Sequence, residues 1–94
     1  MKKISWNAEK GLKLAADYDR GNVGFEDCVL AIEEGRILDI IANPVRTNQK
    51  MFVLHINGYA YVVPFVEDED GIFLKPVYPS RKHTAIYLGS ETDG

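Results

Sequence analysis

The dipeptide Asn57-Gly58 constrains the fold of this chain more than any other feature of the sequence. It separates two strand-like segments, KMFVLHI and YAYVVPFV, and Asn-Gly between apolar runs is the strongest short signal for a hairpin turn of two residues. A turn of this length fixes the register, and the expected pairs are Ile56 with Tyr59, Leu54 with Tyr61, Phe52 with Val63 and Lys50 with Phe65.

This register divides the side chains between two faces. The residues just paired share one face, while Val53, His55, Ala60 and Val62 lie on the other. Because both faces are apolar, we expect helices to cover one of them and a partner or substrate to cover the other.

A second hairpin is predicted at the acidic run Glu67 to Asp70, which leads into the strand-like segment IFLKPVY. The length of this turn decides where Lys75 lies, because a slip of one residue flips every side chain to the other face. A four-residue loop places Lys75 on the face of His55, and a five-residue loop places it on the face of Lys50. The sequence leaves both registers open.

Helical patterns precede the strands. Asn7 is suited to cap a helix that starts at Ala8 and continues to about Asp19. A second helix is expected from about Phe25 to Glu34, with Gly35 at the left-handed position that ends it. Its apolar stripe consists of Phe25, Cys28, Val29 and Ile32. A short helix or turn is expected near Thr84 to Leu88.

These elements predict an α+β fold in which two N-terminal helices pack on one face of a four-stranded antiparallel sheet, followed by a short C-terminal helix or turn. The 94 residues are enough for a single domain, residues 1–94, with a flexible tail at about 89–94.

Composition excludes several classes of protein. The net charge of −3 argues against coating by nucleic acid through bulk electrostatics, and the single cysteine, Cys28, excludes an internal disulfide and a cysteine metal cage. Cys28 and Trp6 are both interpreted as packing residues.

We find no signal peptide and no apolar run that could span a bilayer, so a cytoplasmic location is expected. No dinucleotide or P-loop glycine motif, zinc spacing or serine elbow occurs, and two histidines are too few for a metal site, so no cofactor and no metal are expected.

Cations gather in the second half of the chain. Between Pro44 and Leu88 the only acidic residues are those of the acidic turn. The same stretch contains Arg46, Lys50, Lys75, Arg81 and Lys82. A basic patch on a mildly acidic molecule is therefore predicted.

The segment KPVYPSRKHTAIYLG, residues 75–89, combines these cations with hydrogen-bonding side chains. Arg81 can grip a phosphate with two parallel donors, Lys75 and Lys50 supply compact charges, and His83 or Tyr78 can move a proton. These groups suit the metal-free attack of an RNA 2′-hydroxyl on its adjacent phosphate. The alternative interpretation is a solvated helix start that Ser80 simply caps.

The order of features resembles the BrnT family of bacterial toxins, which belong to the wider RelE/ParE-like group. The similarity is carried by WNAEK, GFEDCVLAIEEG, NQKMFVLHING, VVPFV and the closing basic segment. It implies the toxin of a type II toxin–antitoxin system, a metal-independent ribonuclease that cleaves mRNA, stops translation and is covered by a cognate antitoxin.

The resemblance also implies roles for single residues. Lys75 and Arg81 would stabilise phosphate charge, with His83 or Tyr78 handling protons. The residues that would bind RNA are Arg46, Lys50, Ser80 and Lys82. Two alternatives remain open: a non-catalytic protein-interaction module on the same fold, and a gyrase-directed poison like some members of the wider group.

Overall fold

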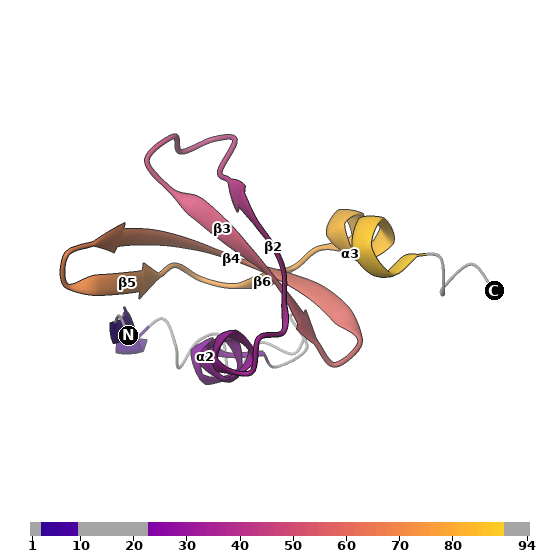
Figure 1. Ribbon diagram of the computed structural model, residues 1–94, viewed down its shortest axis with the longest axis horizontal. Coiled ribbons are helices and arrows are strands. Elements are labelled where there is room, and N and C mark those ends of the chain that lie inside the picture. The colour runs from indigo at the N-terminus through magenta and orange to yellow at the C-terminus, as the bar shows by residue number, and fades with distance from the viewer. Residues whose placement is uncertain (1–2, 10–22, 90–94) are drawn as a thin grey trace.

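A computed structural model describes residues 3–9 and 23–89 of the chain (Figure 1). Its strands are β1 (Lys3–Trp6), β2 (Ile37–Ala42), β3 (Lys50–Ile56), β4 (Tyr59–Asp68), β5 (Gly71–Leu74) and β6 (Tyr78–Pro79). Its helices are α2 (Phe25–Glu33) and α3 (Arg81–Leu88). Ala8 and Glu9 are also helical, and the rest of the predicted first helix lies outside the described residues, as do residues 90–94 of the predicted tail.

The sheet differs from the predicted four antiparallel strands. It has six strands in the order β1-β5-β4-β3-β2, with β6 pairing β4, and it is mixed because β1 runs parallel to β5. The described residues therefore begin with a strand rather than with the predicted pair of helices, and the first helix that they define in full is α2. The prediction missed β1 because four residues, KISW, are too short to show a reliable period of two.

The predicted hairpin at Asn57-Gly58 is confirmed in every pair. Ile56 lies opposite Tyr59, and the ladder continues without a shift to Lys50 opposite Phe65. Asn57 and Gly58 have φ angles of 54° and 76°. Positive φ at both central residues is the requirement of the turn type that matches strand twist, and these two residue types tolerate it.

The acidic turn resolves the face of Lys75. Asp68 pairs with Gly71 and Phe65 with Leu74, so the loop is shorter than either predicted length. It differs from the four-residue alternative by an even number of residues, and it therefore places Lys75 on the face which that alternative predicted. The Lys75 amide donates to the carbonyl of Pro64 at 2.7 Å, and Lys75 lies on the face of His55. The predicted strand IFLKPVY is then interrupted, because Pro76 has no amide hydrogen to donate and β6 resumes with the register moved by one residue.

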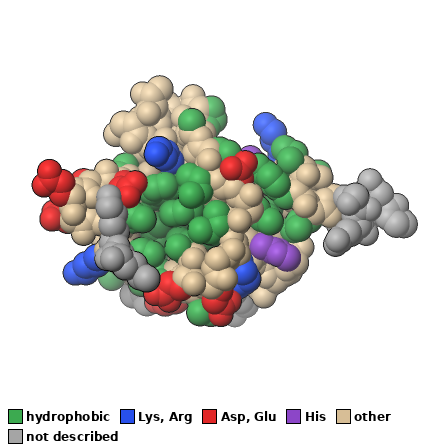
Figure 2. Space-filling model, in the orientation of Figure 1, with side chains coloured by type: hydrophobic (Ala, Val, Ile, Leu, Met, Phe, Trp, Pro, Cys, Tyr) green, Lys and Arg blue, Asp and Glu red, His purple; other side chains and the backbone are tan. Residues whose placement is uncertain are grey.

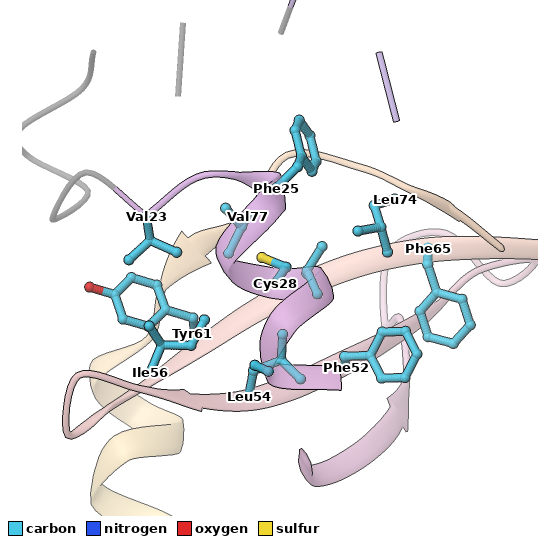
Figure 3. Close-up of a cluster of buried hydrophobic side chains, with 12 residues drawn as sticks. Val23, Phe25, Cys28, Phe52, Leu54, Ile56, Tyr61, Phe65, Leu74 and Val77 are labelled. Carbon is cyan, nitrogen blue, oxygen red and sulfur yellow. The ribbon is translucent and has the colours of Figure 1, made fainter. Parts of the chain in front are cut away.

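One side of the sheet, here called the α2 face, carries the main core. Figure 3 shows Cys28 of α2 among side chains of the strands, with Phe52 beside Phe65. The predicted apolar stripe of α2 is confirmed, since Phe25 and Cys28 are buried and Val29 and Ile32 pack against the same cluster. Gly35 has the expected positive φ, at 76°.

Trp6 of β1 packs on this core, as predicted for an anchor residue. Its ring is stacked on that of Phe25, with the ring centroids 5.6 Å apart. β1 can approach β5 because Gly71 faces Lys3 in the parallel pair and has no side chain. A Cβ atom at Gly71 would lie 2.2 Å from the carbonyl oxygen of Lys3.

The other side of the sheet, here called the α3 face, is partly covered by α3, which corrects the expectation that helices occupy one face only. A smaller cluster of Met51, Val53, Ala60 and Val62 lies here, and Tyr87 of α3 packs on it. The helix begins at Arg81, three residues earlier than the predicted Thr84, because Ser80 caps it by accepting a hydrogen bond from the His83 amide.

Candidate anion-binding site

A polar hollow of about 350 Å³ opens between the β2–β3 loop and the chain after β5. Arg46 and Lys75 both line it. The other lining residues are Asn43, Gln49, Pro64 and Pro76, and of the described residues around the hollow none is acidic. The site thus offers two cations and two amide side chains to a ligand and no side chain that would repel an anion.

Asn43 organises the loop that carries Arg46. Its side-chain oxygen accepts hydrogen bonds from the amides of Val45 and Arg46, at 2.9 and 3.1 Å. The backbone amide of Asn43 donates to the backbone carbonyl of Gln49 at 3.1 Å, and the backbone amide of Gln49 donates to the backbone carbonyl of Arg46 at 3.0 Å. An asparagine whose side chain accepts hydrogen bonds from the backbone amides that follow it forms a fixed turn. The backbone at Arg46 is therefore held in place.

Lys75 forms the opposite wall. Its backbone is fixed by the bond to Pro64, and its ammonium lies 5.2 Å from the centre of the Phe73 ring. Phe73 pairs with Val66, so the ring lies on the α3 face beside Lys75. A cation is attracted to the face of an aromatic ring, and this contact restrains the Lys75 side chain, which also lines the hollow.

Lys50, the other lysine predicted to bind RNA, lies apart from this hollow. It pairs with Phe65, whose side chain belongs to the α2 face, whereas Lys75 is on the α3 face. Lys50 lines a different hollow of about 150 Å³, together with Asn48, Phe65 and the acidic Glu67. The structure therefore brings Arg46 and Lys75 together and separates Lys50 from both.

Tyr78 is 39% exposed and lies on the same face as Lys75, because it pairs with Val62. Its hydroxyl donates to the sulfur of Met51 at 3.8 Å, and Met51 lies opposite Pro64, which lines the hollow. The phenol therefore contacts Met51 on the α3 face, and Tyr78 is not among the residues that line the hollow.

The remaining predicted site residues lie at the start of α3, outside the hollow. Arg81 and Lys82 are exposed in the first turn. Ser80 is buried and its hydroxyl lies 2.7 Å from Nδ1 of His83. Ser80 thus has the capping role that the alternative interpretation gave it, and one ring nitrogen of His83 is occupied by that contact.

A second polar cluster joins α3 to β2. The His83 ring is stacked on Tyr87, with centroids 6.4 Å apart, and the Tyr87 hydroxyl donates a hydrogen bond to the Asp39 carboxylate. That bond lowers the pKa of Asp39, with help from the Ile40 amide, and raises the pKa of Tyr87. Sequence reasoning missed both residues because 48 positions separate them and nothing local marks the pair.

Asn43 and Gln49 were also missed as site residues. Asn43-Pro44 was interpreted only as the end of a strand, although an asparagine before a short polar loop also indicates a turn in which its side chain bonds the following backbone.

Cys28 is not a reactive group of this site. It is buried, and burial together with Asp27 and Glu26 raises its pKa to about 12, so the thiolate does not form.

The part of the chain that the structure describes contains no group of three or more histidine, cysteine or acidic side chains placed to hold a metal ion. Within the same residues, no helix has the length and apolar character needed to cross a membrane. Set against known protein families, curated proteins and solved structures, the chain matches none.

Proposed function

We propose that this chain is the toxin of a bacterial type II toxin–antitoxin system, a metal-independent endoribonuclease that cleaves mRNA and inhibits translation in the cytoplasm. The observation that carries the proposal is the convergence of Arg46 and Lys75 on one polar hollow without an acidic lining residue. The resemblance to BrnT-like toxins supports it independently, because it rests on sequence segments rather than on this geometry.

In the proposed reaction the RNA 2′-hydroxyl loses its proton to a base and attacks the adjacent phosphorus. The new bond joins the 2′-oxygen to phosphorus, the bond from phosphorus to the 5′-oxygen breaks, and the leaving oxygen takes up a proton. The products are a 2′,3′-cyclic phosphate and a 5′-hydroxyl end. Negative charge grows on the phosphate oxygens in the transition state, so fixed cations accelerate the step.

The described residues divide these roles by position. Arg46 presents a planar fork that matches two phosphate oxygens, and Lys75 supplies a compact charge from the other wall. Tyr78, whose exposed side chain lies on the same face as Lys75, is the proton-transfer group we favour over His83, because His83 lies on α3 and contacts Ser80. Arg81 and Lys82 then hold the RNA backbone beyond the hollow.

A cognate antitoxin is part of this proposal, and it would cover the cations of the α3 face. Large apolar side chains are exposed on the elements that border this face, with Val45 in the loop at 84% and Ile86 of α3 at 60%. A protein partner that buried both would exclude RNA from the hollow at the same time.

A non-catalytic protein-interaction module is the second candidate. The separation of Lys50 from Lys75 and the net charge of −3 favour it, because a continuous phosphate-binding track across all the predicted cations does not form. Acidic side chains, which contribute to this negative charge, lie at the left-hand end of the molecule in Figure 2, over the turn between β4 and β5.

The deciding experiment is induced expression in a bacterium, followed by purification and incubation with RNA in excess EDTA. We expect the wild-type chain to arrest growth and to leave 2′,3′-cyclic phosphate ends, and the Arg46→Ala/Lys75→Ala double variant to do neither. Lys50→Ala is the matched control, because it removes a cation from the opposite face. Undisturbed growth and intact RNA with the wild-type chain would contradict the ribonuclease and leave the interaction module.

A further inference from the structure

Strand β2 forms one end of the sheet. β3 lies on one side of it, and no strand among residues 3–9 and 23–89 pairs with its other side (Figure 1). Five of its six residues, ILDIIA, are apolar, and only Asp39 is charged. Ile40 at the middle of the strand is 49% exposed. A short strand of branched apolar residues at the end of a sheet is prone to pair with another copy of itself, because its outer backbone groups are open to a further strand.

The backbone of β2 points alternately toward β3 and away from it. The Asn43 amide donates to the Gln49 carbonyl, and Asp39 occupies an equivalent position of the same antiparallel ladder, so the backbone groups of Asn43 and Asp39 point toward β3. The amides of Ile40 and Ala42, at the intervening positions, therefore point away from β3. They lie where a further strand would place its carbonyl groups.

Asp39 covers this outer edge with its own side chain. Its Oδ1 accepts a hydrogen bond from the Ile40 amide at 2.8 Å, and its Oδ2 accepts one from the Tyr87 hydroxyl of α3. The Ile40 amide thus already has an acceptor in place of the carbonyl that an added strand would offer. In a symmetric antiparallel pair of two β2 strands, both Asp39 carboxylates would also lie near the centre of the pair, where like charges repel.

A bulge in β2 accompanies this arrangement. Between Ile37 and Asp39, β2 has one residue more than the facing part of β3. The extra residue, Leu38, packs on the smaller cluster of the α3 face, and Asp39 lies on the same face, where it bonds Tyr87. Bulges and charged side chains are both devices by which natural sheets prevent pairing at an edge strand. In β2 the two devices occur at neighbouring residues.

We infer that Asp39 is a gatekeeper residue, a charged side chain that keeps β2 from pairing with β2 of a second copy of this chain. It does so by bonding the Ile40 amide and by holding a negative charge at the edge of an otherwise apolar strand. Tyr87 restrains the carboxylate in this position from α3. The inference is independent of the proposed ribonuclease, because Asp39 and Tyr87 are not among the residues that line the hollow of Arg46 and Lys75.

Sedimentation equilibrium of the full chain over a range of protein concentrations tests the inference. We expect Asp39→Val and Asp39→Ala each to self-associate at concentrations at least about ten-fold below any at which the wild-type chain does. Asp39→Ala removes the carboxylate without adding apolar bulk, so it separates the loss of the gatekeeper from a gain of hydrophobic surface. The double variant Asp39→Ala/Ile40→Lys returns a charge to the edge and is expected to be monomeric again, with the circular dichroism spectrum of the wild type.

Amide hydrogen exchange followed by NMR shows whether β2 is the interface. In associated Asp39→Ala, the amides of Ile40 and Ala42 should exchange at least about ten-fold more slowly than in the wild type, because they gain carbonyl partners from the second copy. Three results would overturn the inference. They are a monomeric Asp39→Ala at every concentration, association that leaves these two amides exchanging as in the wild type, and a double variant that associates as strongly as Asp39→Ala.

Discussion

The hydroxyl of Tyr87 donates a hydrogen bond to the carboxylate of Asp39, and this contact fastens α3 to the edge strand β2. This polar link between side chains joins the last turn of α3 to the sheet. The bond requires Asp39 to be ionised and Tyr87 to be protonated. Its contribution to stability is therefore lost both at low pH, where Asp39 gains a proton, and at high pH, where Tyr87 loses one.

We predict that the stabilisation from this bond is greatest near neutral pH and declines toward both extremes. The pKa of Asp39 is lowered below 3.8, so its contribution is present above that pH and is lost as the pH falls through the lowered pKa. The pKa of Tyr87 is raised above 10.0, so its contribution is present below that pH and is lost as the pH rises through the raised pKa.

Denaturant unfolding of wild type and Tyr87→Phe at pH 3, 7 and above 10 tests this dependence. The variant keeps the ring that stacks on His83 and removes only the hydroxyl. The difference in the free energy of unfolding between the two proteins should be largest at pH 7. A difference that stayed constant across the range would show that the bond does not form.

Gly71→Ala is predicted to be among the most destabilising changes in the chain. Gly71 has a φ of 148°, and an added Cβ would lie 2.2 Å from the Lys3 carbonyl oxygen. Backbone strain and overlap together should cost about 2–5 kcal/mol. Gly58→Ala is the matched control, because its φ is also positive, at 76°, but nothing lies within 4 Å, and only about 1–2 kcal/mol is expected. Equal losses in chemical denaturation would contradict the close packing of β1.

The parts of the fold that the sequence predicts well are those in which neighbouring residues decide the structure. Asn57-Gly58 fixes its own turn and the whole β3–β4 register, and Phe25 to Gly35 contains both the stripe and the end of α2. β1 could not be predicted in the same way. Its parallel pairing with β5 joins Lys3 to Gly71, which are far apart in the sequence, and four residues contain too little pattern to predict it.

The site was predicted in part for a similar reason. The residue types at Arg46 and Lys75 were identified from local composition, but whether they meet depends on the parity of the acidic turn, which the sequence left open. The same parity separates Lys50 from Lys75. For the segment after β6, the structure gives Ser80 the capping role of the alternative interpretation, while its predicted role in RNA binding stays a prediction. Position in the sequence alone did not show that Arg81 would lie outside the hollow.

Cys28 is predicted to be inert while the chain is folded. It is fully buried, and its pKa of about 12 leaves almost no thiolate at neutral pH. Reaction with an aromatic disulfide reagent should therefore follow the unfolding of the protein rather than the concentration of the reagent. Cys28→Ser should lower stability by about 1–3 kcal/mol, because it buries a hydroxyl in an apolar core, and should leave RNA cleavage unchanged. Rapid labelling in native buffer would contradict this placement.

Thr84 links α3 to the sheet through a buried hydroxyl. It accepts a hydrogen bond from the Ala60 amide at 2.9 Å and donates to the Ser80 carbonyl at 2.7 Å. Thr84→Val keeps the shape but leaves the Ala60 amide without its partner, and we expect a loss of about 1–3 kcal/mol. Thr84→Ser retains the hydroxyl and should lose less, because only a methyl group is removed. Urea unfolding of both variants measures the difference, and equal losses would assign the effect to packing.

The salt dependence of RNA binding should separate the cations of the two faces. Each phosphate contact with a single strand contributes about 0.7 to the slope of the logarithm of affinity against the logarithm of salt concentration. Arg46→Ala and Lys75→Ala should each reduce the slope by about that amount, because both residues line the hollow. Lys50→Ala removes the same charge from the α2 face and should leave the slope unchanged. Titrations of an uncleavable oligonucleotide at several salt concentrations provide the measurement, and equal effects of all three variants would show that RNA responds to net charge rather than to this site.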